Sequence, residues 1–460
     1  MTPPGPESHL LSRLLGVEPD EAPAVATGVL LFFLLFAGYF MLRPVRETMG
    51  IAGGVGNLQW LFTGTFVATL AAIPLFGWIA ARAPRRRILP WTYGFFALNL
   101  LGFAGAIAAQ PDNPWIARAF YIWLSVFNLL AISVAWSVLA DLFSVAQAKR
   151  LFAVMAAGAS AGGLVGPLLG VLLVGSLGLP GLMVLSTALL LGSAAAARAL
   201  QAWRDQRPLR PDEQAARRQP LGGNPLAGIG TVLRSRYLLG IAAFVVLLAS
   251  VTTFLYFEQA RLVELHFPDR TDQTRVFGTL DFIVQSLALL TQLFLTGRIV
   301  QRLGIVVLLT AVPVVMTLGF LWLALAPTFA VFAVVMVMRR AGEYALSRPG
   351  REMLFTVVPP EAKYKAKNVI DTAVYRGADA VSGWVKTGID AIAANPAVVA
   401  VAGALLALAW AFTGWSLARQ QKALVTGDAA IETGLGREPH PDLAPSQVPG
   451  RSEKQRPSGV

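Results

Sequence analysis

Twelve long apolar runs constrain the fold of this chain more than any other feature of its sequence. A segment needs roughly 20 mostly apolar residues to cross about 30 Å of hydrocarbon. The 460 residues are 55% hydrophobic and 14% charged, and their mean hydropathy of +0.60 exceeds that of soluble domains. The runs cover residues 24–42, 58–80, 88–109, 115–143, 151–174, 182–200, 237–257, 276–296, 305–326, 329–346, 369–392 and 397–417.

Helices rather than strands account for these runs. Lipid offers backbone amides no hydrogen-bond partners, and a helix satisfies its own amides within one segment. The period-2 alternation that is typical of a membrane β-barrel does not run through the segments. The sequence therefore predicts an all-α integral membrane protein with twelve transmembrane helices.

The loops between the runs carry most of their positive charge on one side of the membrane. With both termini in the cytoplasm, the cytoplasmic loops hold 20 Lys and Arg residues and the opposite loops hold five. Cytoplasmic loops are enriched in these residues, so we expect a multi-pass protein of the bacterial inner membrane with both termini inside. The net charge of +12 then meets anionic lipid headgroups, and we expect no nucleic-acid partner.

Several function classes lack their motifs in this sequence. The chain has no cysteine and three histidines, which excludes disulfides and thiolate metal sites and argues against a histidine metal cluster. It contains no Walker-type loop, no H-E-x-x-H motif and no G-x-S-x-G motif. We therefore expect no cofactor, no metal site and no enzymatic activity. We also expect no cleaved signal peptide, because the N-terminal stretch lacks a charged region followed by a short apolar one.

A wide polar gap divides the twelve runs into two groups of six. We expect two pseudo-symmetric bundles and two polar segments, namely an N-terminal bundle (1–203), a central cytoplasmic loop (204–236), a C-terminal bundle (237–424) and a disordered cytoplasmic tail (425–460).

The loops after the second and eighth runs share a pattern, from Gly77 to Arg82 and from Gly297 to Arg302. It resembles the loop signature of the major facilitator superfamily, in which glycine lets helices approach and arginine pairs on the cytoplasmic side. A positive loop with a packing glycine would produce either copy alone.

The fifth run carries glycines at close to four-residue spacing. Such a stripe predicts tight packing against another helix. The arrangement from Gly162 through Gly166 and Pro167 to Gly170 also resembles part of the fifth-helix signature of facilitator antiporters, which implies exchange.

Ionisable residues inside or next to the apolar runs mark the candidate site, since each costs at least about 2.5 kcal/mol at mid-helix unless paired or hydrated. Arginine predominates, and its planar fork suits carboxylate or phosphate oxygens, which indicates an anionic substrate. The alternative is that arginines and carboxylates pair with one another and close the bundle. The candidate substrate-binding residues are Arg43, Arg46, Arg118, Arg339, Arg340, Glu343, Arg351 and Arg376, and the candidate coupling or ion-pair residues are Glu47, Asp141, Glu258, Asp281, Asp371 and Asp379.

A stretch of about 40 residues resembles the ATP/ADP translocase family of bacterial parasites and plastids. It runs from Glu343-Tyr-Ala-Leu-Ser-Arg-Pro-Gly-Arg-Glu-Met353 through Lys363-Tyr-Lys-Ala-Lys367 to Arg376, and the family pattern is roughly K-Y-S-L-F-D-x-x-K-E-M, K-x-K-G-K and R-x-G-K. Two shorter matches are Gln147-Ala-Lys-Arg150, with glutamine for glutamate, and Arg43-Pro-Val-Arg46-Glu47-Thr48. The family exchanges nucleotides on a facilitator-type fold without hydrolysing them. Carried over by position, the candidates are Arg46, Gln147, Lys149, Arg150, Glu352, Lys363, Lys365, Lys367, Asp371 and Arg376.

The sequence thus predicts a secondary transporter of major facilitator type that works by alternating access. Its expected partners are a small organic anion, with nucleotide exchange implied by the resemblance, and membrane lipid, and we expect a monomer. Two alternatives stay open: a proton-coupled facilitator for another small amphiphilic or organic solute, and a non-transporting membrane scaffold or sensor.

Overall fold

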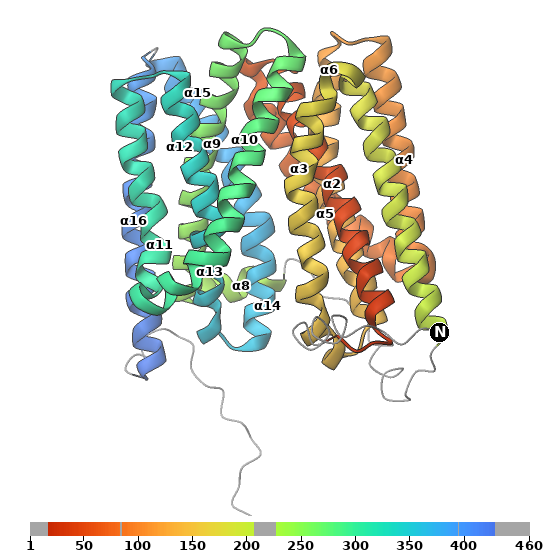
Figure 1. Cartoon of the computed structure of the whole chain (residues 1–460). Coiled ribbons are helices and arrows are strands. Elements are labelled where there is room, and N and C mark those ends of the chain that lie inside the picture. Colours follow the sequence, from red (N-terminus) through yellow and green to blue (C-terminus); the bar gives the residue numbers. More distant parts are fainter. Residues whose placement is uncertain (1–16, 83–84, 207–226, 394, 428–460) are drawn as a thin grey trace, which may run out of the picture.

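The computed structural model describes residues 17–82, 85–206, 227–393 and 395–427 (Figure 1). Within these residues the chain is helical and contains no strand, which confirms the all-α prediction. The predicted tail, apart from its first residues, and most of the predicted central loop lie outside the described residues.

The helices follow the apolar runs but extend beyond them. The first group consists of α2 (Ala22–Ala52), the 3₁₀ turn η1 (Val55–Asn57), α3 (Leu58–Arg82), α4 (Arg85–Ala109), α5 (Pro114–Leu142) and α6 (Val145–Asp205). The second group begins with α8 (Ala227–Arg234), α9 (Arg236–His266), α10 (Arg270–Thr291), the π-helical turn η2 (Gln292–Thr296) and α11 (Gly297–Leu325). It ends with α12 (Phe329–Gly342), the π turn η3 (Glu343–Ser347), α13 (Arg348–Leu354), the 3₁₀ turn η4 (Phe355–Val357), α14 (Pro360–Val369), the π turn η5 (Ile370–Val374), α15 (Tyr375–Ile392) and α16 (Pro396–Thr426).

The lengths of the helices agree with a twelve-span protein. In the described part of the chain, eight helices are long and apolar enough to cross a membrane, and two of them comprise 60 and 56 residues. A straight helix of that size would be about 90 Å long, three times the hydrocarbon thickness. Each contains a glycine with positive φ, Gly178 at 65° and Gly304 at 69°, where the chain leaves helical geometry. Dividing both there, and counting α12–α13 and α14–α15 as one crossing each, is consistent with twelve spans.

The helices form two groups that lie side by side (Figure 1), and each group holds a buried apolar cluster. One is formed by α2, α4, α5 and α6, and the other is formed mainly by α9, α11, α12 and α16. We call the described residues 17–206 the N-terminal half and 227–427 the C-terminal half. The predicted central loop contains α8, which packs on α14 so closely that a Cβ at Gly228 would lie 2.1 Å from the Lys365 carbonyl oxygen.

The glycine stripe of α6 packs against the backbone of α2. A Cβ at Gly158 would lie 2.2 Å from the carbonyl oxygen of Val29, and one at Gly162 would lie 2.4 Å from that of Phe33. No side chain fits in this contact, so the tight packing predicted from the stripe is confirmed. The helix that carries two of the candidate arginines is therefore held rigidly against the N-terminal core.

The two halves join on one side of the membrane. We call the side where α2 begins and α16 ends the terminal side, at the bottom of Figure 1, and the other the distal side. A third apolar cluster, which includes Ile51, Leu58, Phe257 and Phe277, unites the halves toward the distal side. Polar contacts add to it there: Thr48 Oγ1 with Thr274 Oγ1 (2.8 Å), Arg270 Nη2 with Asp112 Oδ1 (3.0 Å) and Trp384 Nε1 with Thr63 Oγ1 (3.1 Å).

The two glycines of the predicted loop signature on the terminal side make no close contact with another helix among the described residues. Among the described residues, a Cβ at Gly77 or Gly297 would meet nothing within 4 Å, and Arg302 is exposed. The side chain of Arg82 lies outside the described residues. The expectation that these glycines let helices approach is wrong for this conformation, because the halves join on the opposite side.

Candidate functional site

A cavity of about 550 Å³ lies between the two halves. Pockets of roughly 300–1,000 Å³ are typical of small-molecule sites. Tyr121 and Phe277 belong both to its lining and to the distal apolar cluster, so that cluster borders the cavity on its distal side. The charged and phenolic side chains of the lining are seven arginines (Arg43, Arg46, Arg339, Arg340, Arg348, Arg351, Arg376), five carboxylates (Glu47, Asp281, Glu343, Asp371, Asp379) and five tyrosines (Tyr39, Tyr121, Tyr256, Tyr344, Tyr375).

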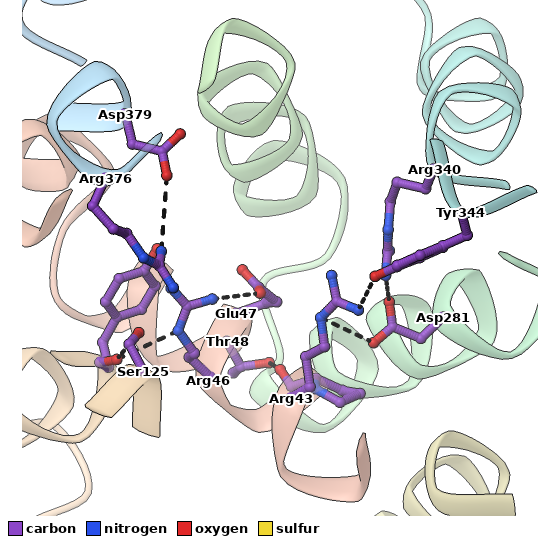
Figure 2. A network of polar contacts seen from close by, with 12 residues as sticks. Arg43, Arg46, Glu47, Thr48, Ser125, Asp281, Arg340, Tyr344, Arg376 and Asp379 are labelled. Carbon is purple, nitrogen blue, oxygen red and sulfur yellow. Dashed lines mark hydrogen bonds and ion pairs between the residues drawn. The ribbon is translucent and has the colours of Figure 1, made fainter. Parts of the chain in front are cut away.

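Arg46 is fixed on the wall that α2 and α5 form. Its guanidinium carbon lies 3.9 Å from the centre of the Tyr121 ring, and its Nη1 donates to Glu47 Oε1 at 3.0 Å (Figure 2). Its Nε also donates to the Tyr121 carbonyl oxygen at 3.4 Å. Stacking on an aromatic face and a charged hydrogen bond together hold the planar fork in one orientation. Pro44 lies in this stretch of α2 and removes one backbone donor from the helix.

Asp281, in the lining of the cavity, links the two halves. Its Oδ1 lies 2.5 Å from Arg340 Nη2, and its Oδ2 lies 3.8 Å from Arg43 Nε (Figure 2). Arg43 comes from α2, whereas Asp281 and Arg340 come from α10 and α12. The Asp281 side chain is 5% exposed, so this is a buried ion pair that a second arginine shares. Arg43 also donates from Nη1 to the hydroxyl of Tyr344 at 3.5 Å.

The other carboxylates of the cavity each have an arginine partner. The remaining pairs are Arg339 with Glu343 (3.0 Å), Arg351 with Asp371 (3.4 Å) and Arg376 with Asp379 (3.8 Å). Pairing, which the sequence left open as an alternative, therefore holds for all five carboxylates. It does not neutralise the lining, because seven arginines face five carboxylates.

Arg348 has no carboxylate within 4 Å in the part of the chain that the structure describes. Its guanidinium lies 4.7 Å from the centre of the Tyr344 ring instead. Arg339 Nε, Arg340 Nε and Arg351 Nε are buried and have no hydrogen-bond partner among the described residues. Buried donors are seldom left unpaired in proteins, so a ligand with several acceptor oxygens would complement this wall.

Two π-helical turns, η3 and η5, contribute to the lining. Such a turn widens the helix, frees backbone groups and occurs often at functional sites. Side chains of η2 satisfy the carbonyls of η3: Gln292 Nε2 donates to the Tyr344 oxygen at 2.9 Å, and Thr296 Oγ1 donates to the Ala345 oxygen at 2.9 Å. These bonds hold the turn from which Glu343 and Tyr344 reach the cavity.

The structure brings eleven of the predicted residues into the lining and leaves the others outside it. Arg118 lies near the start of α5, where its Nε donates to the carbonyl oxygen of Gly53 at the distal end of α2 (2.8 Å) and its guanidinium covers the ring of Trp115. This arginine fixes a turn and does not face the cavity. Glu258 pairs with Arg261 on α9, and Asp141 lies at the end of α5, also away from the lining.

Only some of the residues carried over from the translocase resemblance lie in the cavity. Arg46, Asp371 and Arg376 line the cavity. The basic cluster of α14 and its neighbours lies on the terminal side, outside the cavity, with Lys365 paired to Glu361, Lys367 paired to Glu352, Lys363 half-buried and Lys149 of α6 exposed.

Gln147 and Arg150 join the starts of α2 and α6. Ser144 and Gln147 form a capping box, Gln147 Nε2 donates to Glu21 Oε1 at 2.8 Å, and Arg150 pairs with Glu18 and Glu21. The resemblance implied substrate contacts for both residues, but their partners here are other residues of the chain. A capping role is a sufficient reason for a polar side chain at this position.

Replacing Gln147 by alanine is expected to lower the unfolding free energy by about 1 kcal/mol, since a cap contributes roughly this much. The affinity for anions should not change, because the side chain lies outside the cavity. Thermal unfolding and anion titration of the detergent-purified variant check both expectations. A weaker anion affinity at unchanged stability would instead support the substrate contact that the resemblance implied.

Sequence reasoning missed Arg348 and most of the tyrosines. The hydropathy of the tenth run falls at 346, so Arg348 was counted among loop residues, whereas the helical path continues to Leu354. The spacing of Tyr344 and Arg348, four residues apart, is the signal that could have placed them on one face.

Comparisons with known proteins agree with this architecture. The ADP,ATP carrier protein 1 of Chlamydia muridarum (strain MoPn / Nigg) is 23% identical over an alignment of 504 residues that covers 94% of each chain, which confirms the distant translocase resemblance. A bacterial homologue of the iron transporter ferroportin in an inward-facing state has a TM-score of 0.61 at 14% identity, covering 86% of this chain and 99% of that one. The nucleoside transporter NupG has a TM-score of 0.56 at 14% identity, covering 86% and 98%. The family model of the Major Facilitator Superfamily matches residues 26–375, and the chain therefore belongs to this superfamily of membrane transporters.

Proposed function

We propose that this protein exchanges organic anions across the bacterial inner membrane by alternating access, with both termini in the cytoplasm. The observation that carries the proposal is the cavity between the halves, in which seven arginines outnumber five carboxylates. The distal contacts between the halves support a cavity that faces the terminal side, which is the cytoplasmic side in this orientation. Its tyrosines and phenylalanines offer faces for the planar body of an organic anion.

The charge of the cavity favours exchange over one-way transport. An empty carrier that closes on both sides would enclose guanidinium charges without counter-charges, and uncompensated charge inside a membrane costs at least about 2.5 kcal/mol. A bound anion offsets that cost, so the loaded carrier should return more readily than the empty one. A proton-coupled mechanism finds less support, since a carboxylate that carried the coupling proton would first have to leave its arginine partner.

The direct test is uptake of labelled organic anions, nucleotides among them, into liposomes that contain the purified protein. Uptake should require an anion inside the vesicles. The Arg46→Gln variant should show uptake lower by about tenfold or more, because a hydrogen bond to a charged group contributes roughly 1.5–3 kcal/mol. Equal uptake into empty vesicles would contradict exchange. A folded protein that moves no anion of a broad panel would contradict the proposal as a whole.

A further inference from the structure

The arginines of the cavity exceed its carboxylates by two, and this excess points to the charge of the substrate. We infer that the preferred substrate is a divalent organic anion with a planar body. The inference rests on the proposed function and narrows it to one class of anion. It follows from the charge balance of the lining and from the positions of the two arginines that remain in excess.

The pairing pattern identifies these two arginines. Four carboxylates each have one arginine within 4 Å, and the fifth, Asp281, is shared by Arg340 and Arg43. Arg340 lies much closer to Asp281, at 2.5 Å against 3.8 Å, so Arg43 is the less compensated of the two. Arg348 is the second arginine in excess, since no carboxylate of the described residues lies within 4 Å of it.

Both arginines border the same side chain. Arg43 donates to the hydroxyl of Tyr344, and the Arg348 guanidinium lies over the ring of Tyr344 at 4.7 Å. Arg43 belongs to the N-terminal half and Arg348 to the C-terminal half. An anion with two negative charges beside Tyr344 would therefore meet one guanidinium from each half, and its binding would favour an arrangement in which the halves stay together.

Aromatic side chains of α2 lie next to this position. Phe40 lies 5.9 Å from the Arg43 guanidinium and packs edge-on against Tyr39, with ring centres 5.2 Å apart. Phe36 stacks with Phe40 one helical turn away. All three line the cavity, so a planar group attached to the anionic end can rest on this wall.

The valence of the anion decides how well the closed cavity is neutralised. A monovalent anion leaves one guanidinium charge without a counter-charge, and a trivalent or tetravalent anion adds negative charge that no arginine offsets. Uncompensated charge is disfavoured in a membrane interior, so each of these should bind at least about tenfold more weakly than a divalent anion of the same body.

Two series of anions with a constant body test this expectation. One consists of benzene mono-, di-, tri- and tetracarboxylates, and the other of adenosine mono-, di- and triphosphate, each at pH 8. Dissociation constants from thermal unfolding of the purified protein should be lowest for the divalent member of each series, since a ligand stabilises by mass action. At pH 8 these members are benzenedicarboxylate and adenosine monophosphate. Equal or tighter binding of the trivalent or tetravalent members would overturn the inference. So would a folded protein that binds no member of either series.

Charge variants supply the second arm. Arg348→Gln removes one excess charge and should move the preference toward the monovalent anion. Asp371→Asn, at a 28% exposed position near the terminal side, adds one and should move it toward the trivalent anion. Lys422→Gln removes an exposed charge of α16 outside the cavity and should leave the order of anion affinities unchanged. If Arg348→Gln leaves the order of anion affinities unchanged, the inference is wrong.

The outcomes separate this inference from the proposed function. If the protein exchanges anions of every valence equally well in liposomes, exchange stands and the divalent preference is wrong. If a folded protein exchanges no anion at all, the proposed function itself is wrong.

Discussion

Replacement of Asp281 by asparagine is expected to abolish anion exchange and to lower the melting temperature of the protein by several degrees. The Asp281 carboxylate lies between Arg340 and Arg43 and is 5% exposed. Removing one partner of a buried ion pair costs about 3–5 kcal/mol, because the remaining charge stays buried without compensation. Here two guanidinium groups would lose their shared counter-charge, and the ion-pair link between the halves at the cavity would be lost. Thermal unfolding in detergent and exchange in liposomes measure the two effects.

The same helix offers a matched control for this prediction. Asp272 pairs with Arg275 at the exposed start of α10, so Asp272→Asn should change stability far less. The double variant Asp281→Asn with Arg340→Gln should recover part of the lost stability, since it removes one of the uncompensated charges. Equal destabilisation by Asp281→Asn and Asp272→Asn would show that the buried bridge does not stabilise the fold.

Replacement of Gly162 by leucine is expected to prevent the protein from folding. A Cβ at this position would lie 2.4 Å from the Phe33 carbonyl oxygen and 2.8 Å from the Ala37 amide nitrogen. Both are backbone atoms of α2, so no side chain can move aside and the two helices would have to separate. That separation would open the N-terminal core and displace Arg43 and Arg46 from the cavity. Size-exclusion chromatography of the expressed variant should show aggregate instead of a single symmetric peak.

A glycine elsewhere controls for the substitution itself. Gly102 lies on an exposed face of α4, where an added Cβ meets nothing within 4 Å in the described structure. Gly102→Leu should be neutral or stabilising, because glycine costs a helix up to about 1 kcal/mol. A folded Gly162→Leu variant with normal exchange would contradict the close contact of α2 with α6.

The sequence was sufficient to predict the helices, because a backbone in lipid has few structures other than the helix that satisfy its hydrogen bonds. All twelve apolar runs lie within the helical segments, apart from residues at their ends. It was also sufficient to locate many of the arginines of the cavity. A charged side chain in an apolar span is disfavoured in contact with lipid and therefore faces the interior of the bundle. Arg43 and Arg46 were counted with the loops, since hydropathy falls at 42 although α2 continues to Ala52.

Other parts of the site depend on contacts that composition does not encode. Gln147 has the residue type of a ligand-binding group, and only the neighbouring Glu21 and Ser144 show that it closes a helix end. The basic cluster around Lys365 resembles the translocase pattern in its spacing, yet α14 places it on the terminal side. The π turns carry no signature in the sequence, although they determine which residues of 343–374 reach the cavity.

The wide turn η3 has a consequence for how related chains are compared. A π turn holds one residue more than an α-helical turn, and each residue of an α-helix advances by about 100°. A homologue that lacked the extra residue would present different side chains at the positions that Arg348 and Arg351 occupy here. Two sequences that agree on both sides of such a one-residue gap can therefore still show the solute different side chains, so substrate preference in such homologues must be inferred from the helical register as well as from residue identity.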